Sequence, residues 1–350
     1  MNSRARERTL ARVERLVTAG RGADELMAEA DDLLAATLPH ESHCWHTTDP
    51  DTLIETGFRA FQMPPPDAEV ARFAYLPDDF NAFGALVTGP LHSGVLSEAT
   101  GSRLDRSVRY RELLRPNGIT GELRIALVAD GACWGTLSIF REAPGDFTTD
   151  ERDFAHSLAT VLGKGLRTAG RRARTAPGSA SRWPGVLVVD RAGHPVSLTA
   201  PARTWLAELG APAPEGAAGL PFAVLALAER ARTEEHATAR VHTADGRWLA
   251  LHASALDSPA GDDVAVVIQE AAPDAVAPLL YAAFGFTARE RDIVDAVVQG
   301  GSTEEIAARL FISPLTVQTH LSSIFAKTGV RSRRRLAGLL HGTANTRNLE

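Results

Sequence analysis

The chain has 350 residues, of which 44% are hydrophobic and 23% are charged, and its formal net charge is −6. This length leaves room for two or three domains, and the composition is that of a folded protein rather than a disordered one. No apolar run approaches the roughly 20 residues that cross a bilayer, so we expect no membrane segment. Two cysteines, Cys44 and Cys133, are too few for a disulfide framework, and the charged start of the chain lacks an apolar signal core. These features predict a cytoplasmic protein.

The first predicted domain covers residues 1–168 and opens with helices. Apolar residues recur at helical spacing over 10–17 and again over 26–34. Strands are expected afterwards, and Thr148 with Glu151 forms a capping box that starts a closing helix. The expected strands are Val70–Tyr75, Glu122–Ala129 and Cys133–Arg141, with Asp130-Gly131 as the hairpin turn between the last two. This order predicts an α+β fold.

Part of this domain resembles a known sensor family. The stretch GELRIALVADGACWGTLSIFREAPGDFTTDERDFAHSLATVLGKGL, residues 121–166, is similar to the C-terminal half of GAF domains. The resemblance implies an input module that binds a small ligand or mediates dimer contacts. It implies no cofactor and leaves the ligand unknown, because a fold alone does not reveal what it binds.

Three histidines and a cysteine crowd one short segment: His40, His43, Cys44 and His46. Imidazole and thiolate groups could bind zinc, copper or haem iron, although the spacing matches no closed zinc motif. The alternative is a strand whose Cys44 points inward while the histidines face solvent or cap neighbours. We expect the alternative and therefore no metal site.

A small, polar and basic stretch, residues 169–182, predicts a linker, and a second α+β domain follows over 183–270. The expected elements are strands at Val186–Asp190 and Pro195–Leu198, helices at Trp205–Leu209 and Phe222–Arg232, and strands at Ala237–Thr243, Trp248–Leu256 and Val264–Gln269, the last three joined at Asp245-Gly246 and Gly261-Asp262. This order, and the sequence GVLVVDRAGHPVSL, resemble a PAS domain. Residues 271–283 predict a short connecting helix.

The last predicted domain, residues 284–345, is all helical. Thr287 with Glu290 and Ser302 with Glu305 form two capping boxes, and Ser313 caps a third helix that has proline at its first position. Gly300-Gly301 and Gly329 stop the first and third of these helices, and Ser332 caps a fourth. Short helices in close succession indicate a helix-turn-helix module.

The phrases TARERDIV, STEEIAARLFIS, TVQTHLSSI and GVRSR resemble the DNA-binding domain of LuxR-type transcriptional regulators. The resemblance implies that the third helix enters the major groove. It places four side chains against bases: Leu315, Gln318, Thr319 and Ser322. It places six against phosphates: Thr303, Ser313, Thr316, Lys327, Arg331 and Arg333. The family often has basic residues where Gln318 and Ser322 stand, so we expect modest affinity per monomer and a need for two half-sites.

The distribution of charge along the chain agrees with a separate C-terminal DNA-binding domain. Residues 281–342 contain eight basic and five acidic residues, a net charge of +3, so the remainder of the chain carries −9. Only this end of the chain is suited to approach a polyanion.

The expected protein is a bacterial, homodimeric transcriptional regulator in which two sensor domains gate a reader of double-stranded DNA, with RNA polymerase as a candidate partner. An alternative is a ligand-binding or protein-interaction module to which DNA binding is auxiliary. An enzyme is not expected, because the sequence has no GxxxxGK[ST] phosphate loop, GxSxG elbow or HExxH pair.

Overall fold

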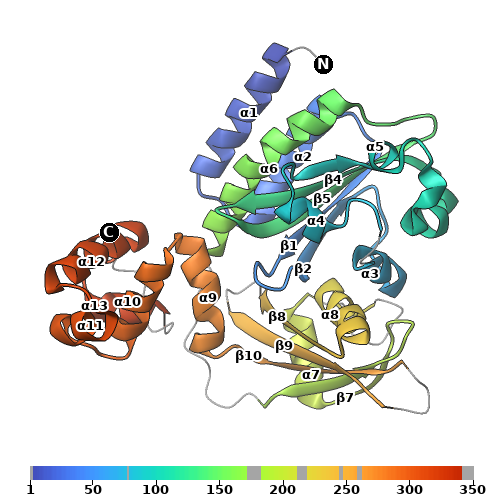
Figure 1. Ribbon diagram of the computed structural model, residues 1–350. Helices are drawn as coiled ribbons and strands as arrows, with labels where there is room; N and C mark the ends of the chain where they lie inside the picture. The colour runs from blue at the N-terminus through green and yellow to red at the C-terminus, as the bar shows by residue number, and fades with distance from the viewer. Residues whose placement is uncertain are drawn as a thin grey trace.

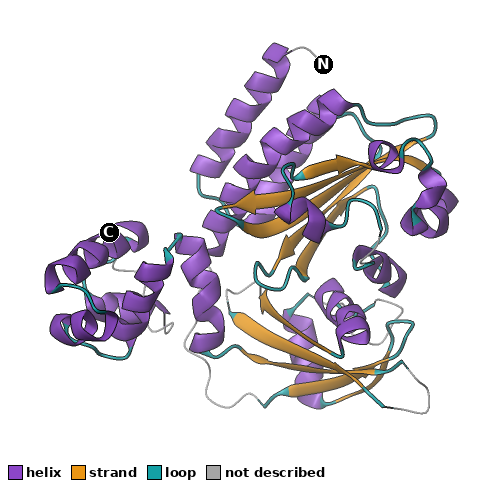
Figure 2. Ribbon diagram, in the orientation of Figure 1, coloured by secondary structure: helices purple, strands orange, loops and turns teal. Residues whose placement is uncertain are grey.

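The computed structural model describes residues 3–76, 79–171, 183–210, 219–243, 247–257 and 262–340. In this part of the chain, two mixed α and β regions stand beside a helical region near the C-terminus (Figure 1, Figure 2). The predicted linker over 169–182 falls largely outside the described residues. So do Asp245-Gly246, Gly261 and the stretch after residue 340. Within the described ranges, every helix is too short or too polar to cross a membrane.

The N-terminal region is built on an antiparallel sheet in the order β2-β1-β5-β4-β3. Its strands are β1 (Ser42–Thr48), β2 (Glu55–Phe61), β3 (Ser93–Val95), β4 (Ile119–Ala129) and β5 (Ala132–Glu142). The predicted hairpin between β4 and β5 is confirmed. Asp130 and Gly131 have φ of 50° and 78°, and positive φ at both central residues is what a two-residue type I′ turn requires.

Three long helices cover one face of this sheet (Figure 1). They are α1 (Ser3–Thr18), α2 (Ala23–Thr37) and α6 (Thr149–Gly170), and they enclose a core with Leu123, Ile125 and Leu137 of β4 and β5. Helix α6 lies on the strands, and α1 packs on α6 and α2. The shorter elements are α3 (Ala68–Ala74), α4 (Phe83–Thr88), α5 (Leu96–Thr100) and the turns Leu104–Arg106, Tyr110–Leu114 and Arg115–Asn117. Helices α1, α2 and α6 confirm the helices predicted from apolar spacing and from the capping box.

The strand predicted at Val70–Tyr75 is wrong, because this segment lies in and directly after helix α3. Asp67 caps the helix by accepting a hydrogen bond from the Val70 amide at 3.0 Å. Ala68 and Ala71, three residues apart, are both buried in a core shared with the second region. The periodicity is therefore helical, and the partner that covers the buried side lies far away in the sequence.

The second region also contains a five-stranded antiparallel sheet, in the order β7-β6-β10-β9-β8. Its elements are β6 (Gly185–Val189), β7 (Pro195–Leu198), α7 (Ala200–Glu208), α8 (Phe222–Glu234), β8 (His236–His242), β9 (Trp248–Ala255) and β10 (Val264–Glu270). The predicted strands and helices are all present, although α7 begins earlier than expected, at Ala200, where Thr199 caps it. Numbered within each region, both sheets have the strand order 2-1-5-4-3, and this order is compatible with the predicted PAS-like fold.

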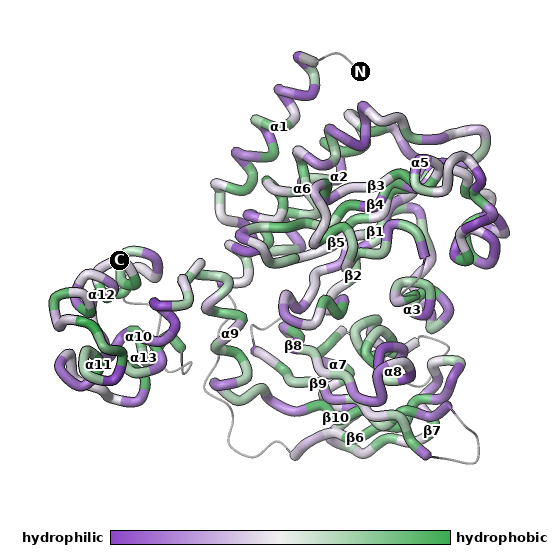
Figure 3. The backbone as a smooth tube through the Cα atoms, viewed as in Figure 1, coloured by the Kyte–Doolittle hydropathy of each residue, from purple (hydrophilic) through white to green (hydrophobic). Residues whose placement is uncertain are grey.

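The C-terminal helices are α9 (Pro273–Phe284), α10 (Ala288–Val298), α11 (Thr303–Leu310), α12 (Pro314–Thr328) and α13 (Arg333–Leu340). Both predicted capping boxes and the Ser313 cap are present. Apolar and polar stretches alternate along α10 to α13 (Figure 3). Their buried side chains, among them Ile293, Val317 and Leu336, belong to one core. This core holds α12 in place.

Helix α9 contacts all three regions, although the sequence indicated only a connector. Arg171, at the end of α6, donates to the Ala283 carbonyl at 2.6 Å. Arg240 of β8 donates to the Ala275 carbonyl at 3.0 Å. Tyr281 donates to Asp295 of α10 at 2.5 Å. The helix therefore links both α+β regions to the helical one.

Candidate nucleic-acid interface

The four predicted base-reading residues lie on one exposed face of α12. Leu315, Gln318, Thr319 and Ser322 occupy positions i, i+3, i+4 and i+7, so they share one side of the helix, and all four are exposed. Leu315 keeps 72% of its surface exposed, compared with 37% for Leu256, the other exposed leucine in the described ranges. The opposite side of the helix is buried by Val317, Leu321 and Ile324. The structure thus brings together all four residues that were predicted to read bases.

A buried carboxylate fixes α12 from behind. Glu290 of α10 has a side chain only 4% exposed, and it accepts hydrogen bonds from Ser323 Oγ at 2.7 Å and Lys327 Nζ at 2.6 Å. It also completes the capping box of α10 by accepting a hydrogen bond from the Thr287 amide at 2.8 Å. Burial alone would raise the pKa of Glu290, but these hydrogen bonds outweigh burial and lower the pKa to about 2. The sequence indicated only the capping role of this residue.

The predicted phosphate ligands divide into three groups. At the start of α12, Ser313 accepts from the Thr316 amide at 3.1 Å, and the hydroxyls of these two residues lie 2.8 Å apart. Hydroxyl groups at the positive end of a helix suit a phosphate oxygen. Ser313 and Thr316 therefore lie together at the start of α12, beside the predicted base-reading face formed by Leu315, Gln318, Thr319 and Ser322.

The second group is bound within the protein. Arg333 donates to the Gly301 carbonyl at 2.8 Å and to Thr303 Oγ1 at 2.6 Å, so the predicted ligands Arg333 and Thr303 hold each other. Lys327 donates to Glu290 and to a backbone carbonyl of the loop before α10, the latter at 2.8 Å. Phosphate contact by Lys327 would require it to be shared with, or released from, these partners.

Arg331 makes up the third group. Its side chain is exposed and, within the described ranges, forms no ion pair. Arg334 and Arg335 nearby are also exposed. Exposed guanidinium groups can meet a polyanion at little cost, and Arg331 is the predicted phosphate ligand with the fewest internal constraints.

The histidine and cysteine cluster does not converge. Alternation along β1 sends neighbouring side chains to opposite faces of the sheet, so Cys44 and His46 lie on the face away from His43. His43 Nε2 lies 2.9 Å from Asp31 of α2, and His43 Nδ1 lies 2.7 Å from His40 Nε2. The burial of Cys44 is confirmed. Of the two expectations for the histidines, that they face solvent or cap neighbours, the first is wrong for His43 and His46, which are 1% and 5% exposed, whereas His43 does contact its neighbours Asp31 and His40.

Asp31 explains the burial of His43. Besides His43, this carboxylate accepts hydrogen bonds from Trp45 Nε1 at 2.8 Å and from Arg59 at 2.9 Å. These partners lower the pKa of Asp31 against the opposing effect of burial. In the described ranges, no group of three or more histidine, cysteine, aspartate or glutamate side chains is placed to hold a metal ion. The alternation of β1 is the physical reason that the cluster itself does not form such a group.

Polar atoms without hydrogen-bond partners lie on the face of the sheet that carries His46. They include His46 Nδ1, Glu55 Oε2 and Arg124 Nε, all buried. His46 Nδ1 lies 3.7 Å from Glu55 Oε2, and Glu55 Oε1 accepts from Thr136 at 2.9 Å. Burial lowers the pKa of His46 and lowers the pKa of Arg124 to about 10. Buried polar groups normally have hydrogen-bond partners, so three such atoms close together are an unusual feature of this face of the sheet. No sequence pattern indicated it.

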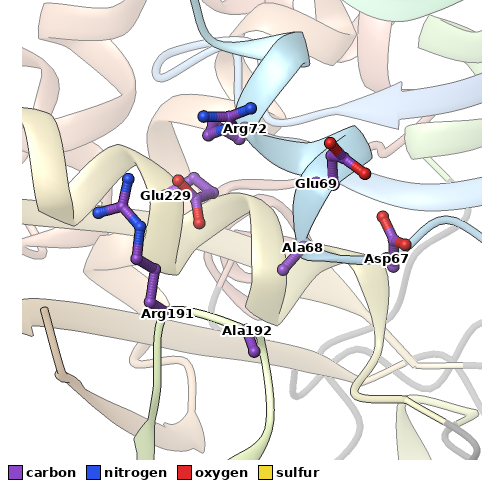
Figure 4. Close-up of a pocket in the computed structure, with 7 residues that line it drawn as sticks. All are labelled: Asp67, Ala68, Glu69, Arg72, Arg191, Ala192 and Glu229. Carbon is purple, nitrogen blue, oxygen red and sulfur yellow. The ribbon is translucent and has the colours of Figure 1, made fainter. Parts of the chain in front are cut away.

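A surface hollow of about 240 Å³ lies between α3, α8 and the turn after β6. Asp67, Glu69, Arg72, Arg191 and Glu229 surround it (Figure 4). Small-molecule sites are mostly apolar and enclosed, whereas this hollow is lined mainly by charged side chains. It marks the seam between the two α+β regions.

Comparisons with known proteins bear on two parts of the chain. The family model for bacterial regulatory proteins of the luxR family matches residues 285–340, which are α10 to α13 and their immediate surroundings. The model for the GAF domain matches residues 88–166, which run from the end of α4 through most of α6. Both matches confirm the resemblances expected from the sequence.

Curated relatives match over short lengths. A protein named as a putative HTH-type transcriptional regulator in Mycobacterium bovis is 55% identical over 47 residues, 13% of this chain and 5% of the relative. The spore germination protein GerE of Bacillus subtilis is 47% identical over 47 residues, 13% of this chain and 64% of GerE. The monoamine regulon transcriptional regulator of Klebsiella aerogenes is 54% identical over 50 residues, 14% of this chain and 22% of that protein. The chain thus spans only a small part of the first of these relatives.

Among solved structures, the GAF domain of a phosphoenolpyruvate-protein phosphotransferase from Coxiella burnetii matches 48% of this chain and 96% of its own, at 17% identity and a TM-score of 0.34. VqmA from Vibrio cholerae, solved with ligand and DNA, matches 48% of this chain and 88% of its own, at 18% identity and a TM-score of 0.25. These scores do not establish a shared overall arrangement. The family models do identify two parts of the chain: it carries a GAF domain and, at its C-terminal end, a DNA-binding domain of the luxR family of bacterial regulatory proteins.

Proposed function

We propose that the protein is a transcriptional regulator that binds double-stranded DNA as a homodimer through α12. The observation that carries this proposal is the base-reading face of α12. Its four side chains are exposed, while the buried side of the same helix is fixed by the core and by Glu290. A rigid helix with an uncovered outer face fits the major groove.

Two copies are expected on each operator. One such helix reads only a few base pairs, and regulators of this build bind half-sites about one helical turn apart. The base-reading face has no basic residue, so electrostatic affinity per copy is limited and the second copy supplies the remainder. Helices α1 and α6 are the candidates for the interface between the copies.

The two α+β regions are proposed as the gate, and α9 as the connection. Arg171 reaches α9 from the GAF domain, Arg240 reaches it from the second domain, and Tyr281 joins it to α10. A rearrangement in either domain that shifts α9 would change the placement of the reader. This is how an input signal would alter the spacing of two copies on DNA.

The buried polar cluster around Glu55 supports a sensing role for the GAF domain. His46, Glu55 and Arg124 would meet a small ligand that has both hydrogen-bond donors and acceptors. The second domain is proposed to be PAS-like. We infer no chemical step in either domain, and we place the protein in the bacterial cytoplasm, where RNA polymerase is available as a partner.

The test is selection from random duplex DNA by the full-length protein. We expect enrichment of one sequence that contains two related half-sites, and loss of the enrichment with Gln318→Ala. Val196→Ala removes an aliphatic side chain that is 60% exposed on β7, far from α12 (Figure 1), and serves as the matched control. If wild-type protein enriches no sequence, the regulator function is overturned. If enrichment appears only with a second protein, the alternative of an interaction module with auxiliary DNA binding is favoured.

A further inference from the structure

The outer face of α12 is short of hydrogen-bond donors. Thr319 Oγ1 donates to the Leu315 carbonyl at 3.1 Å, and Ser322 Oγ donates to the Gln318 carbonyl at 3.0 Å. Both hydroxyl protons are thus used within the helix. What remains outward is the amide of Gln318, the side-chain methyl groups of Leu315 and Thr319, and hydroxyl oxygens that can only accept.

No charged side chain lies on this face of α12, all of whose residues the structure describes. Ala326, the next exposed position along the face, is also uncharged. Two nearby basic residues are engaged elsewhere, since Lys327 binds Glu290 and Arg309 donates to Gln299 at 2.6 Å, and the exposed Arg331 lies beyond the end of α12. The face therefore carries neither a cation nor a carboxylate.

This chemistry discriminates between bases. Guanine is recognised chiefly by arginine or lysine donating to O6 and N7, and the cytosine amino group is recognised by a carboxylate. Neither kind of side chain stands on this face. Glutamine can pair with adenine N6 and N7, and aliphatic groups contact the 5-methyl group of thymine. The recognition groups on the face therefore favour A·T pairs.

Leu315 is the largest apolar side chain on this face. A leucine that is 72% exposed at a helix start contributes nothing to the core and adds apolar surface to the solvent side. In the major groove its methyl groups would lie beside the methyl group of a thymine. Removing one buried methyl group from such a contact weakens binding about fourfold.

We propose that α12 selects A·T-rich half-sites by apolar contact with thymine methyl groups, made by Leu315 and assisted by Thr319, while Gln318 pairs with a neighbouring adenine. This specificity rests on the regulator function proposed above. It assigns Leu315, rather than a basic residue, as the main determinant of which operator is bound.

The experiment replaces thymine with deoxyuridine, which removes the 5-methyl group and leaves base pairing intact. With the full-length protein and its selected operator, affinity is measured by fluorescence anisotropy at one salt concentration, with each thymine exchanged in turn. We expect about a fourfold loss per removed methyl at one or two positions in each half-site. Leu315→Ala is expected to weaken binding to the thymine operator and to be insensitive to the exchange at the same position.

Thermal unfolding checks that the Leu315→Ala variant folds. The Val196→Ala variant again serves as the control, and its affinity should fall on the exchange as much as that of the wild type. Two results would overturn the proposed recognition of thymine methyl groups while leaving the regulator function intact. One is an operator that tolerates deoxyuridine at every position, and the other is a Leu315→Ala variant that loses as much affinity on the exchange as the wild type does. Absence of any selected sequence would overturn both.

Discussion

Arg240 holds Asp49 across the boundary between the two α+β regions. The Arg240 backbone amide and side-chain Nε donate to Asp49 Oδ2 at 2.9 and 2.8 Å, and a further guanidinium nitrogen lies 2.5 Å from Oδ1. The aspartate side chain is 1% exposed and the arginine side chain 11%. Because the same guanidinium reaches the Ala275 carbonyl, one side chain joins the β1–β2 turn, β8 and α9.

Asp49→Ala is therefore expected to destabilise the protein by about 2–3 kcal/mol, since the buried guanidinium of Arg240 keeps only the half-exposed Asp51 as an acidic partner. Urea unfolding of the full-length protein measures the loss, and faster amide hydrogen exchange in α9 would report that the link to the reader is loosened. Arg115→Gln removes an ion pair whose side chains are 58% and 70% exposed, so it should change stability by less than about 1 kcal/mol. Equal effects from the two variants would contradict a special role for the buried pair.

The lowered pKa of Glu290 predicts that the stability of the protein depends on pH. The pKa of this carboxyl is lowered in the folded protein from 4.5 to about 2, because hydrogen bonds from Lys327, the Thr287 amide and Ser323 overcome the effect of burial. The folded state therefore binds the proton only at lower pH than the unfolded state. Ionised Glu290 therefore stabilises the folded protein by up to about 3 kcal/mol. This stabilisation is fully present above about pH 4.5 and is lost as the pH falls towards 2.

The comparison of wild type with Glu290→Gln isolates this contribution, because the other carboxyl groups titrate in both proteins. We expect the difference in unfolding free energy to be largest near neutral pH and to shrink between about pH 4.5 and 2. A difference that stays constant over this range would show that Glu290 is not held as an ion pair.

The backbone conformation of Phe311 predicts that replacing this residue with asparagine stabilises the protein. It ends α11 with φ of 55°, a left-handed conformation that disfavours L side chains other than asparagine and aspartate, and it is 94% exposed. Phe311→Asn is expected to raise the unfolding free energy by about 0.5–1 kcal/mol, because asparagine adopts this conformation readily and no packing is lost. Phe311→Ala keeps the backbone strain and should bring no comparable gain. Thermal unfolding of the three proteins decides between these outcomes.

Arg331 predicts a change in salt dependence. If it contacts a phosphate, Arg331→Gln should reduce the slope of log K against log salt by about 1, leave thermal stability unchanged and weaken binding to all sequences alike. Lys327→Gln should instead lower stability, since Lys327 holds Glu290 at 2.6 Å. The wild-type slope should be shallow, because the base-reading face carries no cation and Lys327 is already paired. A slope as steep as that of a protein with many phosphate contacts would contradict this expectation.

Local patterns predicted most of the secondary structure. The capping boxes at Thr148, Thr287 and Ser302 start the expected helices, as does the proline after Ser313, because cap and helix are neighbours in the chain. The Asp130-Gly131 hairpin is local in the same way. The exposed face of α12 also follows from the sequence, since helical spacing alone separates its outer residues from the buried ones.

The tertiary structure decided what depends on residues far apart in the sequence. Ala68 and Ala71 lie on a helix, not a strand, because they pack into a core that α8 builds. His43 is buried because Asp31 of α2 lies opposite β1. Lys327 is bound by a carboxylate of α10, and α9 is a junction rather than a linker, for the same reason. Periodicity and capping report only the conformation of a segment and the side of it that is apolar. Which partner covers that side is set by long-range packing. The sequence therefore determined helix α12 and its exposed residues, whereas the fold determined which residues hold this helix in place.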